Sequence, residues 1–93
     1  MASEVGWDPA KANRNIGKHG VTFEEASTVF DDPLLITVID AEHSIGEDRY
    51  ITIGRSHQDR LLLVAHADPM GRIRIISARP VTRREEQFYA ESD

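Results

Sequence analysis

The hydrophobic period of this chain changes at Asp31-Asp32-Pro33, and this change limits the folds open to it. In residues 23–30 apolar side chains recur every three or four positions, which predicts a helix. After Pro33, runs of β-branched residues predict strands instead. Helices followed by a block of consecutive strands are typical of an α+β fold. The length of 93 residues suits a single domain covering residues 1–93.

Three segments begin with helix-capping signals. Asp8 followed by proline predicts a helix that runs to about residue 19 and ends at Gly20, which favours the left-handed cap. A threonine followed three positions later by glutamate forms a capping box at Thr22 and again at Thr82. The first box predicts a second helix to about residue 30, and the other opens a C-terminal helix.

Four segments after Pro33 predict strands, at residues 34–39, 50–56, 61–66 and 73–78. Turn-forming residues separate the last three segments, so these should form an antiparallel meander. Residues 4–7 could add a short edge strand. The sequence therefore predicts an α+β fold with two N-terminal helices, a four-stranded, mainly antiparallel sheet and a C-terminal helix.

The charges are segregated along the chain, whose net charge is −5. Residues 19–48 hold eight acidic residues and no lysine or arginine, whereas residues 49–84 hold eight arginines and two acidic residues. A chain divided in this way can present a basic face to a polyanion although it is acidic overall. The planar guanidinium group suits phosphate. The alternative is a sheet whose arginines are only solvated.

Several classes of site and location find no support in the sequence. Without cysteine, neither disulfides nor a thiolate metal site can form, which fits a reducing cytoplasm. No run approaches the roughly 18 apolar residues of a membrane span, and the N-terminus lacks the features of a signal peptide. Residues 40–48 are rich in carboxylates but lack the spacing of a known metal loop. We expect a cytoplasmic protein with no metal and no cofactor.

Arginines gather around the start of the C-terminal helix. Arg83 and Arg84 lie in its first turn, where the positive end of the helix dipole disfavours cations. Such departures from local consistency often mark functional sites, and a helix N-terminus with guanidinium groups suits phosphate. Arg79 lies just before the helix, and Arg72 and Arg74 share one face of the preceding strand. Solvated arginines at a surface corner are the alternative.

Histidines are the other candidates for chemistry. Lys18 and His19 end the first predicted helix, where cations are favourable even without a function. His19 is nevertheless the best candidate for proton transfer, because imidazole titrates nearest to neutral pH. His66 ends an apolar strand and is expected to be packed and hydrogen-bonded. His43 and His57 are expected in loops.

In their order along nearly the whole chain, these residues resemble the BrnT toxin family. The matching pieces are Trp7-Asp8 with Lys11 and Asn15, Lys18-His19-Gly20-Val21, Phe23-Glu24-Glu25-Ala26, Val29-Phe30, Asp32-Pro33, Glu47 with Arg49, Ile53-Gly54 with Ser56, residues 74–79, Thr82-Arg83-Arg84-Glu85 and Tyr89.

The resemblance implies a RelE-like fold and a ribonuclease toxin of a type II toxin–antitoxin system. It further implies inhibition by a BrnA-like antitoxin with a ribbon-helix-helix part, so that operator DNA is bound only through the complex. RNA can be cut without metal because its own 2′-hydroxyl is the nucleophile. We therefore expect a metal-independent endoribonuclease. As a hypothesis, the groups around the scissile phosphate are His19, Arg49, Arg74, Arg79 and Arg83, and those binding RNA are Lys11, Lys18, Arg72 and Arg84.

The chain departs from the family pattern at two places, which keeps other functions open. Ala67-Asp68-Pro69 replaces a common Thr-Glu-Arg, and Glu86 stands where a basic residue is common. Both changes remove positive charge near the expected RNA face. One alternative is a catalytically inactive protein-binding module in an operon-repressing complex. The other is direct DNA binding, although no recognition-helix pattern is visible.

Overall fold

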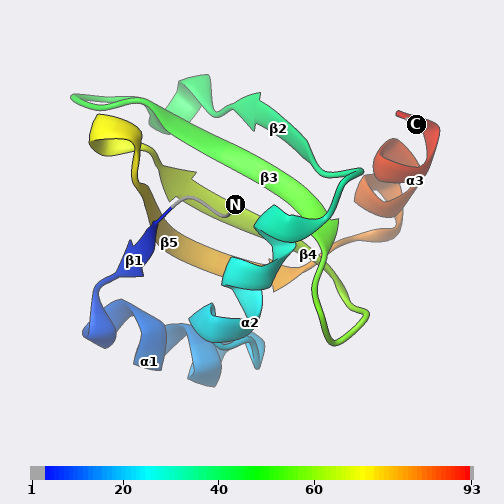
Figure 1. The fold of residues 1–93 in the computed structure, drawn as a ribbon, viewed down its shortest axis with the longest axis horizontal. Helices are drawn as coiled ribbons and strands as arrows, with labels where there is room; N and C mark the ends of the chain where they lie inside the picture. Colours follow the sequence, from blue (N-terminus) through cyan, green and yellow to red (C-terminus); the bar gives the residue numbers. More distant parts are fainter. Residues whose placement is uncertain (1–3, 93) are drawn as a thin grey trace.

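A computed structural model describes residues 4–92 of the chain (Figure 1). The elements follow in the order β1 (Val5–Trp7), α1 (Pro9–His19), α2 (Phe23–Ser27), the 3-10 helix η1 (Thr28–Asp31), β2 (Ile36–Ile39), the 3-10 helix η2 (Ala41–His43), β3 (Arg49–Arg55), β4 (Leu61–Ala67), the 3-10 helix η3 (Pro69–Gly71), β5 (Ile73–Pro80) and α3 (Arg83–Glu91). None of the helices in this part of the chain is long and apolar enough to cross a membrane.

The strands form one sheet in the order β1-β5-β4-β3-β2. The meander predicted for the last three strands is confirmed, and β2 extends it by pairing antiparallel to β3. The prediction of four strands is wrong, because β1 adds a fifth that runs parallel to β5. This strand has only three residues, too few to show a hydrophobic period, and it is fixed by packing: Val5 and Trp7 lie opposite Ile73 and Ile75.

The caps at Asp8, Gly20 and Thr82 are those that the sequence predicts, whereas the capping box at Thr22 is only half formed. The Thr22 hydroxyl accepts the N–H of Glu25, but the Glu25 carboxylate binds Arg60 and Ser56 instead of reaching back. The Asp8 carboxylate accepts the N–H of Ala10, Gly20 adopts a left-handed φ of 68°, and both halves of the capping box at Thr82 are formed. The second helix is shorter than predicted, because α2 ends at Ser27 and continues as η1. The hydroxyls of Ser27 and Thr28 donate to backbone carbonyls three residues earlier, which competes with regular α-helical bonding.

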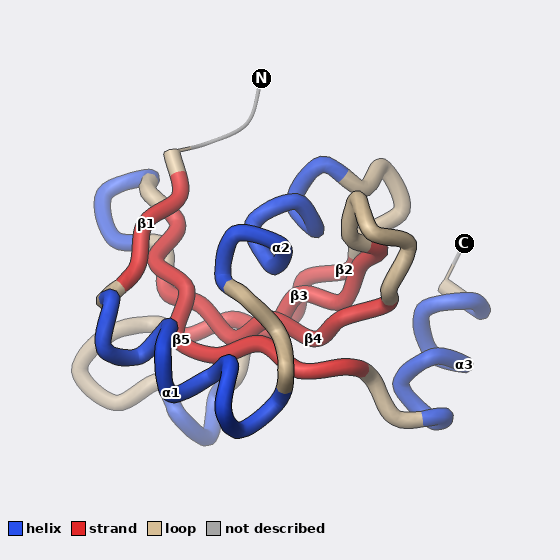
Figure 2. The backbone as a smooth tube through the Cα atoms, turned by 90° about the horizontal axis from the view of Figure 1, so that it is seen from below, coloured by secondary structure: helices blue, strands red, loops and turns tan. Residues whose placement is uncertain are grey.

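One face of the sheet is covered and the other is largely open. Figure 2 shows α2 over one face, α1 beside the outer edge of β5 and α3 at the far end of the sheet. The ring of Trp7 meets that of Phe23 edge-on, with 6.0 Å between the ring centroids. The core under α2 consists of Val21, Phe23, Ala26, Val29, Leu62, Val64, Ile75 and Ala78, all at most 1% exposed.

A β-bulge in β5 changes which side chains share a face. Ala65 pairs with Ser77 and the next residue, His66, pairs with Ile75, so Ile76 is an extra residue. Ile75 and Ala78 are therefore both buried although they are three positions apart. In a regular strand Arg74 and Arg79 would point to opposite faces. The bulge places both on the face turned away from α2, as bulges beside functional sites often do.

Gly54 is a position where any side chain would collide with the packing of η1. A Cβ built there lies 2.8 Å from Cγ1 and 3.2 Å from the carbonyl oxygen of Val29. We expect Gly54→Ala to lower the free energy of unfolding by about 1–3 kcal/mol, measured by urea denaturation. Gly17→Ala in α1 is the matched control, because its Cβ meets nothing within 4 Å and alanine favours helix. A Gly54→Ala protein as stable as the wild type would contradict this packing.

Candidate functional site

The face turned away from α2, called the open face below, carries an apolar strip flanked by arginines. Side chains alternate along a strand, so the buried Leu62 and Val64 of β4 place Leu63 and Ala65 on the open face. α3 contacts β3 at one end of the sheet, where the Tyr89 hydroxyl donates to Asp32. The register gives the cross-strand rows Arg49–Ala67–Arg74, Val38–Ile51–Ala65–Ser77 and Ile36–Ile53–Leu63–Arg79.

Acidic side chains orient two of these arginines. Arg79 donates both terminal nitrogens to the Glu85 carboxylate, at 2.9 and 2.8 Å. Arg74 donates to Glu47 from the loop before β3. The side chains of Arg74 and Arg79 remain 43% and 36% exposed, so each can still meet a ligand. The Nε of Arg49 is buried and has no hydrogen-bond partner among the described residues.

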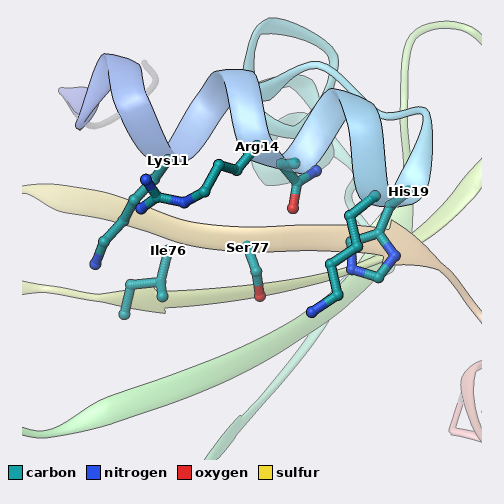
Figure 3. Close-up of a pocket in the computed structure, with 7 residues that line it drawn as sticks. Lys11, Arg14, His19, Ile76 and Ser77 are labelled. Carbon is teal, nitrogen blue, oxygen red and sulfur yellow. The ribbon is translucent and has the colours of Figure 1, made fainter.

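A second cluster of basic groups lines a cavity of about 270 Å³ between α1 and the outer edge of β5. We call it the cationic cavity. In Figure 3 the side chains of Lys11 and His19 reach from α1 past β5, near Ile76 and Ser77. Within residues 4–92 none of its basic groups forms an ion pair with a carboxylate, so they are available to an anion. The lining consists of Lys11, Arg14, Asn15, Lys18, His19, Ile76 and Ser77.

Asn15 fixes α1 against the sheet edge. Its amide nitrogen donates to the carbonyls of Ala78 at 2.8 Å and Val21 at 2.9 Å, and its amide oxygen accepts the N–H of Ala78 at 3.1 Å. The side chain thus makes the two hydrogen bonds that a neighbouring strand would make. Ser77 comes just before Ala78 and faces the open side, so it lies where the cationic cavity meets the open face.

The structure brings together only part of the predicted site. Lys11, Lys18 and His19 lie in one cavity, while Arg74 and Arg79 share the open face with Arg49, which is two strands away from β5.

The remaining predicted arginines lie outside the cationic cavity. Arg83 and Arg84 are exposed on the first turn of α3, and neither forms an ion pair with another described residue. Arg72 is exposed and forms a loose pair with Glu4 at 3.4 Å.

Four lining residues were not among the predicted site residues: Arg14, Asn15, Ile76 and Ser77. Arg14 could have been found, since it lies at helical spacing from Lys11 and Lys18. Ser77 could not, because its direction depends on the bulge.

His66 and His57 lie as the sequence predicts, whereas His43 ends the 3-10 helix η2 and does not lie in a loop. His66 is 2% exposed, with Nε2 2.7 Å from the Thr52 hydroxyl and Nδ1 2.6 Å from Asp68. Asp68, one of the departures from the family pattern, thus has a partner in the core. His43 and His57 lie outside the regular strands, beside Asp40 and Asp31 respectively.

The Arg79–Glu85 pair predicts a defined acid response. The hydrogen bonds from Arg79 lower the pKa of Glu85 from 4.5 to about 2, although burial opposes the shift. A lowered folded-state pKa stabilises the protein above the unfolded value, and this stabilisation is lost as the pH falls from 4.5 towards 2. We expect Glu85→Gln to cost about 1 kcal/mol at pH 6, because the pair is partly exposed, and less at pH 2.5.

Urea denaturation of both proteins at the two pH values measures this difference. The matched control is Glu86→Gln, which changes an exposed carboxylate in the same turn. A cost for Glu85→Gln that does not shrink on acidification would mean that the pair does not stabilise the fold.

Comparisons with known proteins show which family this chain resembles in sequence and in fold. The family model described as "Ribonuclease toxin, BrnT, of type II toxin-antitoxin system" matches residues 7–85. The fold is similar to that in the 1.1 Å crystal structure of the Brucella abortus ribonuclease toxin BrnT, with a TM-score of 0.61 and 21% identity over 88% of this chain and 100% of that one. No curated protein matches. Since the family model spans most of the sequence, the chain belongs to the BrnT family of ribonuclease toxins of type II toxin–antitoxin systems.

Proposed function

We propose that this protein is an endoribonuclease that cuts RNA without a metal ion, at the junction of the cationic cavity and the open face. The observation that carries the proposal is the alignment of Arg74, Ser77 and Arg79 on one face beside the cationic cavity. Basic groups without an acidic partner bind phosphates, and arginines held in place by carboxylates stabilise charge as it develops.

The reaction needs only groups that the chain supplies. The 2′-hydroxyl of the RNA attacks the adjacent phosphorus and loses its proton, while the 5′-oxygen of the next nucleotide leaves and gains one. The products are a 2′,3′-cyclic phosphate and a 5′-hydroxyl. His19 is the candidate for proton transfer, since it lies at the sheet edge and not under α2.

The arginines divide into two roles in this proposal. Arg74 and Arg79 stabilise the phosphorane, and Arg49 on the same face contributes a further guanidinium donor. Arg83 on α3 completes the set around the reacting phosphate. The neighbouring phosphates are bound by Lys11, Lys18, Arg72 and Arg84.

We further propose that the protein acts in the cytoplasm and is neutralised by a BrnA-like antitoxin with a ribbon-helix-helix part. Membership of a type II family implies an antitoxin partner. The half-buried Ile51, Leu63 and Ala65 of the open face, with the exposed Val38 beside them, suit a protein inhibitor, because covering them would exclude RNA as well. Operator DNA would then be bound only through the complex.

Cleavage of single-stranded RNA by the purified, antitoxin-free protein in excess EDTA tests the proposal, with analysis of the new ends. We expect fragments with 2′,3′-cyclic phosphate ends. Cleavage that occurs only when Mg²⁺ replaces EDTA would overturn metal independence. An absence of cleavage even with ribosomes present would support instead an inactive binding module, which the loss of a family arginine at Pro69 favours.

A further inference from the structure

A second cavity, of about 430 Å³, lies along β1 and the first half of β5. We call it the β1–β5 cavity. Most of its lining surface is apolar, and the two arginines at its border belong to β5 and the turn before it. It is lined by Glu4, Val5, Gly6, Trp7, Asp8, Pro69, Arg72, Ile73 and Arg74.

Gly6 leaves room in this cavity for a flat group. A Cβ built on Gly6 meets no atom within 4 Å, so the space above the glycine is empty. Gly6 pairs with Arg74 in the parallel register, which puts the Arg74 guanidinium on the same face of the sheet as this space. The Arg74 guanidinium is bound to Glu47 from the loop before β3, on the side of β5 away from β1, so a planar ring can lie on the Gly6 backbone with Arg74 at the border of the cavity.

The two cavities are lined by neighbouring stretches of β5. Ile73 and Arg74 line the β1–β5 cavity, and Ile76 and Ser77 line the cationic cavity. Single-stranded nucleic acid has the same division, since its bases stack on apolar or planar surfaces and its phosphates bind cations. A nucleotide whose phosphate lies at the cationic cavity therefore has an apolar site for a base within reach along the same strand.

We propose that the β1–β5 cavity binds one base of the single-stranded RNA, stacked on the Gly6 backbone with Arg74 at the border of the cavity. The inference rests on the proposed ribonuclease function and adds a base-binding site to it. The bound base then holds the RNA chain in register with the site of cleavage.

Gly6→Val tests the inference by filling the cavity from its floor. Valine favours strands, and its side chain would enter empty space, so the fold should be kept. The probe is a fluorescent 2′-O-methyl RNA octamer, which lacks the attacking hydroxyl and reports binding alone. We expect Gly6→Val to weaken its binding about tenfold or more. The salt dependence of the dissociation constant should stay the same, because no phosphate contact is lost.

Gly17→Ala is the matched glycine control, since its Cβ also meets no atom within 4 Å and Gly17 does not line the β1–β5 cavity. A second probe that lacks its bases but keeps the backbone should bind wild type and Gly6→Val equally well. If the octamer bound both proteins equally, or if Gly6→Val weakened both probes alike, the inference would be wrong. Wild-type protein that binds the octamer in a Gly6-dependent manner but cuts no RNA would uphold the base site and overturn the ribonuclease proposal.

Discussion

Arg74→Ala is expected to slow RNA cleavage by about 10²–10³-fold in the antitoxin-free protein. Arg74 lies on the open face, is oriented by Glu47 and borders the β1–β5 cavity. Loss of a pre-oriented donor removes stabilisation of the charge that develops on the phosphorane, so the catalytic rate should fall. Arg74→Lys keeps the charge but not the planar fork, and should recover only part of the rate. Single-turnover cleavage of a defined RNA measures both variants.

The effect of losing any positive charge on the rate of cleavage has to be distinguished from the effect of losing the Arg74 guanidinium itself. Arg55→Ala is the matched control. Arg55 also lies on the open face, but at the end of β3 opposite to Arg49, which shares a cross-strand row with Arg74. It pairs loosely with Asp59 at 3.4 Å. Arg74→Ala should change the unfolding free energy by less than about 1 kcal/mol, because the pair with Glu47 is partly exposed. Equal loss of cleavage in Arg55→Ala and Arg74→Ala would remove Arg74 from the reaction.

Arg60→Ala is expected to have the largest effect on stability, a loss of about 2–4 kcal/mol in the free energy of unfolding. Glu25 has only 3% of its side chain exposed, and Arg60 donates to it at 2.9 and 2.6 Å. These hydrogen bonds lower the pKa of Glu25, whereas burial raises it. Without Arg60 the buried carboxylate keeps only the hydroxyl of Ser56, so its pKa should rise and the fold should weaken.

The two side chains of this pair differ in exposure, and this difference allows the prediction to be checked. Glu25→Gln should cost less than Arg60→Ala, since the Arg60 side chain is 41% exposed and can turn towards water. Urea denaturation of both variants at pH 7 measures the difference. Arg55→Ala again serves as control, with an expected change below about 1 kcal/mol. If Glu25→Gln proved the more damaging change, the buried carboxylate would not be what the pair protects.

The parts of the fold that local chemistry determines could be predicted from the sequence. Asp8, Gly20, Thr22 and Thr82 cap helices where the pattern places them, since capping depends on a few neighbouring residues. Strand β1 could not be assigned firmly. Three residues are too few to show a hydrophobic period, and each residue of β1 pairs with a residue of β5 that lies 68 positions later in the sequence.

The site was less predictable than the fold. The basic residues were visible as types, but their grouping depends on Asn15 holding α1 at the edge of β5 and on the extra residue Ile76. Residues 73–78 read as a regular strand, and nothing in their composition signals a bulge. Arg79 was expected at the phosphate, and the structure adds that Glu85 holds it.

The extra residue in β5 has a consequence for how genes of this kind can change. A point mutation at Ile76 alters one side chain, whereas deletion of its codon would remove the bulge. Arg74 and Arg79 would then be four positions apart, and a regular strand would still place both on the open face, opposite Ala67 and Leu63. At the present length they are five positions apart, so a strand that became regular without losing a residue would turn one of them under α2. Lineages that inherit this strand can therefore shorten it here and keep both oriented guanidinium groups on one face.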